Sequence, residues 1–190
     1  MARLDDARAV VDDVRAAGSD AVRAVAVAAA ERVCDPELPM LTLADLGVLR
    51  AVQLLAGDDG EPLVVVTITP TYTGCPATAA MRADLTRALA AAGLARVEVR
   101  LALDPPWTTD WIRPRGRAAL QPAGISPPGP APRRGSGPVP LTLLGSPPAP
   151  TCPRCGSAAT VPTSRFGPTP CTALHRCTAC GEPFEHVKEL

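Results

Sequence analysis

The chain of 190 residues carries 19 basic and 19 acidic side chains, and a net charge of zero gives it no overall attraction to nucleic acid or to an anionic membrane. Its length accommodates one modest domain plus a small second unit, and it excludes a large enzyme with a deep two-domain cleft. Apolar residues make up 46% of the chain but aromatic residues only 3%, so the core must be thin and aliphatic, and a small unit would need a metal to hold it together.

Residues 1–19 form an acidic extension without the apolar segment of a signal peptide, although residues 4–16 have helical spacing. The longest uncharged Ala/Val run, residues 24–30, is too short to cross a membrane. Seven cysteines, an odd number, favour a reducing compartment and metal or thiol chemistry over disulfides. We therefore expect a cytoplasmic protein with no membrane partner.

Residues 20–33 have the spacing of a second helix. The segment that follows, Asp-Pro-Glu-Leu-Pro at residues 35–39, must end this helix because two prolines cannot continue it, and it predicts a rigid acidic loop. Thr42 and Asp45 have the spacing of a capping box, and Gly47 is placed to end that short turn.

The middle of the chain predicts a small sheet with helices. A hairpin turn at residues 57–60 separates two strands, of which the second is almost continuously apolar and should be central. An apolar stripe at every fourth residue predicts a helix with Pro76 at its first position, and the alternation that follows predicts a half-buried strand. The expected elements are strands at 48–55 and 62–69, a helix at 77–93, a strand at 97–103 and a short helix at 114–120.

This order predicts an α+β fold, a helix-strand-strand-helix-strand-helix sandwich over residues 20–120. Residues 121–150 contain ten Pro and five Gly, a composition that cannot bury a core and therefore predicts an extended linker. A second unit of the zinc-ribbon type is expected at residues 151–190.

Two Cys-x-x-Cys pairs, each followed by glycine, predict the metal site of that second unit: Cys152 with Cys155, and Cys177 with Cys180. A tight turn lets both thiolates of a pair reach one ion, and four thiolates close a tetrahedron around zinc. The 21 residues between the pairs slightly exceed the usual spacing. An iron-sulfur cluster and a redox dithiol stay open as alternatives.

Two further residues bear on the choice of ligands. Cys171 lies between the two pairs, so it could replace one of the four ligands or be a packed, spare thiol. His175 could compete as a ligand or lie on the surface.

Cys75 is the candidate functional thiol of the first unit. It joins a central strand to a helix N-terminus, where unpaired N–H groups and the helix dipole would stabilise a thiolate and lower its pKa from about 8.5. Such a thiol can bind a soft metal, carry a cluster or act as a nucleophile, and the alternative is a buried, inert cysteine. A thiol hydrolase is disfavoured because residues 1–110 contain no histidine to act as a base.

Acidic side chains could accompany this thiol. Asp35 and Glu37 could supply oxygen ligands or an acidic patch near Cys75, although solvated loop charges are the more frequent outcome. Cys34 beside them is expected to pack in the core.

Charge is unevenly distributed along the chain. Residues 1–110 hold 10 Arg and 16 acidic residues, whereas residues 111–181 hold eight Arg and no acidic residue. This basic stretch is either a solvated surface or a docking surface for an acidic partner or a CoA phosphate. Because aromatic residues are not interleaved with the arginines, no nucleic-acid partner is expected.

Taken together, these motifs resemble a known family. Residues 35–39, 45–47 and 71–76 resemble the small iron-sulfur assembly domain shared by SufT and PaaD-type proteins. The tail motifs narrow the resemblance to the PaaD (PaaJ) family, accessory subunits of the bacterial phenylacetyl-CoA epoxidase of phenylacetate catabolism. These tail motifs are Trp107-Thr-Thr-Asp-Trp111, Ser164-Arg-Phe-Gly-Pro-Thr-Pro-Cys171 and Cys177-Thr-Ala-Cys-Gly-Glu-Pro-Phe184.

The resemblance implies a protein that is not catalytic alone. Its implied role is to aid iron-sulfur cluster assembly or maturation of the oxygenase, with a stoichiometric docking subunit as the alternative. The implied partners are the oxygenase subunits, above all the iron-sulfur flavin reductase. The implied cofactors are a structural zinc ion, held by the tail cysteines, and a transient iron-sulfur cluster. Cys75 is the implied cluster- or metal-transfer thiol, with Asp35, Glu37 and Thr71 near it.

Overall fold

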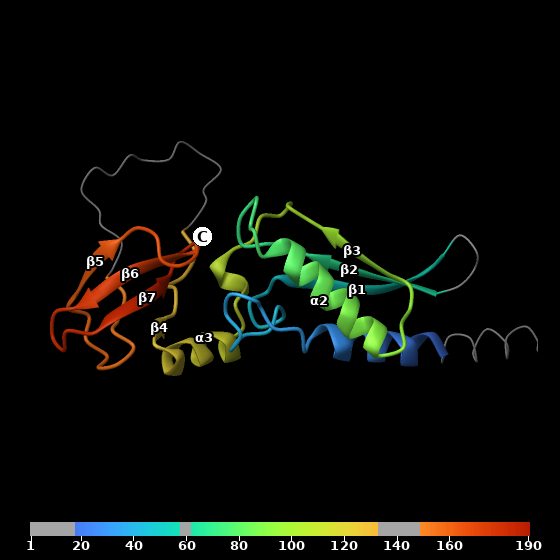
Figure 1. The fold of residues 1–190 in the computed structure, drawn as a ribbon, viewed down its shortest axis with the longest axis horizontal. Helices are drawn as coiled ribbons and strands as arrows, with labels where there is room; N and C mark the ends of the chain where they lie inside the picture. The colour runs from blue at the N-terminus through green and yellow to red at the C-terminus, as the bar shows by residue number, and fades with distance from the viewer. Residues whose placement is uncertain (1–17, 58–61, 133–148) are drawn as a thin grey trace, which may run out of the picture.

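The computed structural model describes residues 18–57, 62–132 and 149–190, which form two units lying side by side (Figure 1). One unit packs helix α2 (Thr78–Ala91) on a three-stranded sheet, and the other is a four-stranded sheet near the C-terminus. The fold is therefore α+β, as predicted. Within the described ranges, no helix is long and apolar enough to cross a membrane. The helix predicted at 4–16 and most of the turn predicted at 57–60 lie outside the described residues.

The first sheet has the order β1-β2-β3. Strands β1 (Leu49–Ala56) and β2 (Pro62–Ile68) are antiparallel, and β2 is parallel to β3 (Val97–Leu101), with α2 as the crossover between them. Strand β2 is central, as predicted, because a run of three valines, Val64 to Val66, is buried on both faces of the sheet.

Two helices supply the rest of this core. Residues 18–30 are helical and bury Ala26, Ala29 and Ala30, but the helix ends three residues before the predicted position. Helix α2 buries the predicted stripe, namely Ala77 just before its first residue and then Met81, Leu85 and Leu89. Pro76 lies before α2 rather than at its first position.

Strand β3 departs from the expected half-burial. Val99 is buried, whereas Leu101 is 45% exposed and Leu103, beyond the end of the strand, is 51% exposed. Because β3 is an edge strand, it has a neighbouring strand on one side only. The apolar alternation therefore predicted the strand but overstated how much of it is covered.

A buried polar turn fixes the segment that follows the acidic loop. The amide of Asp45 donates to the Thr42 hydroxyl at 3.0 Å, and the amide of Thr42 donates to the Asp45 carboxylate at 3.1 Å, which is the reciprocal pattern expected from the capping-box spacing. Arg115 on α3 (Pro114–Leu120) donates to both carboxylate oxygens, at 2.9 and 2.7 Å. One buried carboxylate thus ties the turn to α3.

This ion pair predicts an acid-sensitive contribution to stability. Hydrogen bonds from Arg115 hold the pKa of Asp45 at about 2, below its ordinary value of 3.8. A group whose pKa is lowered in the folded state stabilises that state above the unfolded pKa, and this stabilisation is lost as the pH falls from about 4 to about 2. Because the guanidinium is 76% exposed, solvent screens the pair, and we expect Asp45→Asn to cost about 1 to 2 kcal/mol at pH 7.

Urea unfolding followed by tryptophan fluorescence would measure this cost, because both tryptophans of the chain belong to the first unit. The difference between Asp45→Asn and the wild type should shrink below pH 4. Glu98→Gln, which breaks the exposed pair with Arg100, should leave the free energy of unfolding almost unchanged, because solvent screens that pair. Equal effects of the two variants would contradict the role given to Asp45.

The second sheet has the order β4-β7-β6-β5. Strands β5 (Thr160–Ser164), β6 (Thr172–Cys177) and β7 (Pro183–Val187) are antiparallel neighbours. Strand β4 (Ile125–Ser126) pairs in parallel with Glu185 and His186 of β7. The segment predicted as a linker over residues 121–150 is therefore partly structured, since a short 3-10 helix η2 (Gln121–Ala123) and β4 lie within it. Residues 133–148 lie outside the described residues.

Several contacts join the two units. The amide of Thr109, in the 3-10 helix η1 (Thr109–Trp111), donates to the carbonyl of Leu190 at 3.2 Å, and Leu190 packs against the apolar core of the first unit. Val187 belongs to the same apolar cluster as the core of the first unit. The ribbon therefore packs against the first unit.

Candidate metal and thiol sites

The two Cys-x-x-Cys pairs lie on turns of matching geometry. In the first, the amide of Gly156 donates to the carbonyl of Cys152 at 2.9 Å, and in the second, the amide of Gly181 donates to the carbonyl of Cys177 at 3.0 Å. Both glycines have positive φ, 72° and 81°, a conformation that favours glycine. The glycine after each pair thus has the role expected from the sequence.

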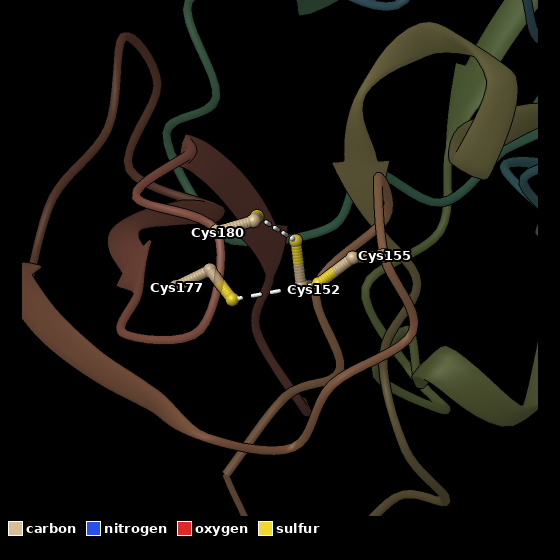
Figure 2. A group of neighbouring side chains, drawn as sticks. All are labelled: Cys152, Cys155, Cys177 and Cys180. Carbon is tan, nitrogen blue, oxygen red and sulfur yellow. Dashed lines mark hydrogen bonds between the residues drawn. The ribbon is translucent and has the colours of Figure 1, made fainter.

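The four sulfur atoms of Cys152, Cys155, Cys177 and Cys180 converge from these turns (Figure 2) and lie within 4.8 Å of one another. The Sγ atoms of Cys152 and Cys180 are 3.8 Å apart, and those of Cys155 and Cys177 are 3.6 Å apart. A zinc ion with Zn–S bonds of about 2.3 Å needs sulfur atoms about 3.8 Å apart at the corners of its tetrahedron. A disulfide would need about 2.05 Å. The spacing therefore fits a tetrahedral metal ion and no disulfide.

Local amides favour the thiolate form of Cys177, whereas hydrogen bonds to the neighbouring thiols raise the pKa of Cys155 to about 12. Hydrogen bonds from the backbone amides of Cys180 and Ala179, together with neighbouring thiols, lower the pKa of Cys177 to about 7. The apolar cluster of the ribbon itself consists of Cys152, Cys177 and Phe184. So small a core cannot hold a fold by burial alone, and two of its three members also belong to the group of four converging sulfurs.

Cys171 and His175 lie outside this group of four sulfurs. The ring of His175 stacks on Phe184 at 5.8 Å between centroids and meets the ring of His186 edge-on at 5.6 Å. Among the described residues, the four cysteines form the one such group of potential metal ligands. The geometry thus favours Cys152, Cys155, Cys177 and Cys180 as the ligand set.

Cys75 is buried, at 7% exposure, in the loop between β2 and α2. Its pKa is raised, contrary to the sequence-based expectation, because burial disfavours the thiolate. A hydrogen bond with the backbone at Ala77 lowers the pKa, as expected near a helix N-terminus, but the carboxylates of Glu37 and Asp35 raise it further. The prediction of a thiol that is activated in the free protein was therefore wrong.

The acidic loop is shaped by Asp35, and both of its carboxylates act on the pKa of Cys75. Asp35 is buried and uses its Oδ1 to accept the amides of Glu37 and Leu38, each at 2.8 Å, so it shapes the loop. Glu37 is only half-buried and is the better placed of the two carboxylates to meet a ligand. Thr71 is half-buried in the loop of Cys75. Cys34 is exposed rather than packed in the core, because it follows the end of the first described helix and pairs with Thr42 through its backbone.

Tyr72 is a residue of this site that the sequence did not single out. Burial raises its pKa to about 12, and the negative charges of Cys75, Glu37 and Cys171 add to this effect. Its hydroxyl oxygen is buried and, among the described residues, has no hydrogen-bond partner. The Cys75 thiol acts on the pKa of this hydroxyl, but the two groups do not form a hydrogen bond of good geometry. The sequence could have identified Tyr72 as part of this site, because it lies three residues before Cys75 in the same loop.

Half of the arginines in the basic stretch have partners within the described part of the chain. Arg113 pairs with Glu31, Arg115 with Asp45 and Arg154 with Glu182, while Arg117 donates to the carbonyls of Thr109 and Pro128. Four of the eight arginines thus have internal roles, which weakens the interpretation of this stretch as a docking surface.

Comparisons with known proteins agree with these two units. Residues 23–101 match the family of iron-sulfur cluster assembly proteins, and residues 136–188 match the PaaD zinc beta ribbon domain. A protein of Escherichia coli strain K12, provisionally named as one of the subunits of 1,2-phenylacetyl-CoA epoxidase, is 43% identical over 157 residues, which cover 83% of this chain and 87% of that protein. The chain belongs to the PaaD family.

Solved structures also resemble this PaaD family member. A DUF59 domain of unknown function from Bacillus anthracis shares 27% identity, covering 55% of this chain and 96% of that one, with a TM-score of 0.47. A Mycobacterium tuberculosis protein, described as associated with iron-sulfur complex assembly and repair, shares 29% identity, covering 53% of this chain and 84% of that one, with a TM-score of 0.34.

Proposed function

We propose that this PaaD protein is an accessory component of the phenylacetyl-CoA epoxidase, not catalytic by itself, which delivers iron or an iron-sulfur cluster to the reductase of that oxygenase. The name of the Escherichia coli relative and the match to the iron-sulfur assembly family support this proposal. In this function, iron or a cluster is the cargo, and the ribbon holds a structural zinc ion that closes its four-thiolate site.

The observation that carries the proposal is the surroundings of Cys75. The thiol is buried, and the Tyr72 hydroxyl and the Glu37 carboxylate, two groups suited to holding a metal, both act on its pKa. The two histidines of the chain, which could have acted as a base, contact each other, Phe184 and Glu189 instead. A thiol without a base partner suits metal transfer better than hydrolysis.

The test is to express the reductase with the wild type, with Cys75→Ser and without this protein, and to assay its iron and acid-labile sulfide. The reductase should be fully loaded only with the wild type, and Cys75→Ser should give the content found without the protein. Cys34→Ser, which changes an exposed free cysteine, is the matched control and should behave as the wild type. Equal cluster content in all samples would refute the proposal.

A further inference from the structure

A cleft of about 610 Å³ opens at the boundary between the two units. Binding clefts in proteins usually have volumes of about 300 to 1,000 Å³, so this one has room for side chains of another molecule. The acidic loop of the first unit forms one side of the cleft, and the ribbon sheet forms the other. Its lining includes Glu37, Leu38 and Met40 from the loop and Ile125, Leu174 and Glu185 from the ribbon.

A row of three side chains crosses the ribbon sheet at this cleft. Glu185 of β7 pairs with Ile125 of β4 on one side and with Leu174 of β6 on the other. Side chains at opposite positions of neighbouring strands lie on the same face of a sheet, and all three line the cleft. The ribbon therefore contributes a carboxylate flanked by two apolar side chains.

The loop on the other side of the cleft is fixed by its own hydrogen bonds. The Oδ1 atom of Asp35 accepts the amides of Glu37 and Leu38, each at 2.8 Å, and the amide of Leu41 donates to the carbonyl of Leu38 at 2.8 Å. Met40 lies within this ordered turn, yet its side chain is 40% exposed. Because methionine side chains are unbranched and flexible, an exposed one adapts well to the surface of a partner.

The charge of the cleft is unbalanced. Its charged lining residues are Glu37, Glu182 and Glu185, and no Lys, Arg or His is among the described residues that line it. Glu182 pairs with Arg154, whereas Glu37 and Glu185 form no ion pair within the described part of the chain. Both of these carboxylates are half-buried, and a half-buried charge without a partner is costly to desolvate. A cation from another molecule would balance them.

We propose that this cleft docks a segment of the reductase that receives the cargo, and that this segment places a Lys or Arg side chain beside an apolar one. The cation pairs with Glu185, across the cleft from Glu37, and the apolar side chain packs against Leu38, Met40 and Leu174. This inference rests on the proposed function and names the chemistry of its partner. Apolar contacts surrounded by polar and charged groups are the usual composition of such interfaces.

Binding of the purified reductase to the full-length, zinc-loaded protein tests this inference, with calorimetry as the measurement. Glu185→Lys reverses a charge inside the cleft and should raise the dissociation constant at least about tenfold, because like charges would then face each other. Glu98→Lys makes the same change of net charge on β3, outside the cleft, and should bind as the wild type. Zinc content and circular dichroism show whether the variants are folded. Equal binding by Glu185→Lys and the wild type, or no binding by the wild type, would overturn the inference.

Met40→Asp distinguishes a fitted cleft from a general attraction between opposite charges. This change adds a carboxylate but removes an exposed apolar side chain, so it should weaken binding severalfold. A surface that attracts the reductase by charge alone would bind it more tightly after the same change, and that result would overturn the inference.

A second copy of the chain is the other occupant to exclude, and light scattering measures the mass of the free protein. The wild type and Glu185→Lys should have the same mass. If the wild type is a dimer that Glu185→Lys converts into a monomer, the cleft is an interface between copies and the inference fails.

The cluster content of the reductase separates this inference from the proposed function. If binding depends on Glu185 and cluster content depends on Cys75, both stand. If cluster content depends on Cys75 but binding is unaffected by Glu185→Lys, the docking cleft fails while the proposed function survives. If binding depends on Glu185 but cluster content is unaffected by Cys75→Ser, the docking cleft survives and the proposed function fails.

Discussion

Replacing Cys177 with serine should remove the zinc ion from the ribbon and unfold that unit. Cys177 is fully buried, ends β6 and supplies one of four converging sulfur atoms. Structural zinc sites of this type bind with about 10 to 16 kcal/mol, and that free energy is also the folding free energy of the unit. The small apolar cluster of the ribbon cannot replace it, since two of its three members belong to the same four-sulfur group.

Metal analysis and circular dichroism would measure this effect. The purified wild type should contain one zinc ion per chain and no iron, and a strong chelator should unfold its ribbon. Cys177→Ser should contain almost no zinc. Cys34→Ser removes an exposed thiol outside the ribbon and should keep the metal. Iron in place of zinc in the wild type, or zinc retained by Cys177→Ser, would contradict a structural zinc site.

Replacing Gly47 with alanine should destabilise the first unit by about 4 kcal/mol or more, a size that single substitutions seldom reach. Gly47 has φ of 69°, in the left-handed region, where an alanine alone costs about 1 to 2 kcal/mol. An added Cβ would also lie 2.6 Å from both the Cβ and the carbonyl oxygen of Trp111. The backbone of this turn and the Trp111 segment would have to move apart.

Gly93→Ala is the matched control for Gly47→Ala. Gly93 has φ of 87°, but a Cβ there would meet nothing within 4 Å, so only the backbone strain should be felt. Urea unfolding followed by tryptophan fluorescence should therefore give a loss of about 1 to 2 kcal/mol for Gly93→Ala and a clearly larger one for Gly47→Ala. Similar losses for the two variants would show that the contact with Trp111 is unimportant.

Local sequence was sufficient to predict most of the helices, strands and turns of the first unit. The run of valines in β2, the four-residue stripe of α2 and the reciprocal spacing of Thr42 and Asp45 all express interactions between near neighbours in the chain, and the structure confirms them. The same holds for the cysteine turns of the ribbon, where glycine follows each pair.

Long-range packing accounts for what the sequence did not predict. Strand β4 has two residues and no periodicity, and it exists because β7, distant in the chain, offers a partner. The raised pKa of Cys75 depends on how deeply the folded chain buries it and on a loop that begins at Asp35. From its place between the two pairs in sequence, Cys171 could have replaced a ligand or been a spare thiol, and only the folded chain shows that its sulfur lies outside the four-sulfur group.

The pairing of β4 with β7 also constrains how the protein can be divided or recombined. The segment that matches the ribbon family begins at residue 136, yet the sheet of that ribbon includes Ile125 and Ser126. A fragment cut at the family boundary would keep all four cysteines of the candidate metal site but leave one edge of β7 unpaired, and unpaired strand edges promote self-association. A chimera of two relatives would therefore need its crossover before residue 125, so that β4 and the rest of the ribbon sheet come from the same parent.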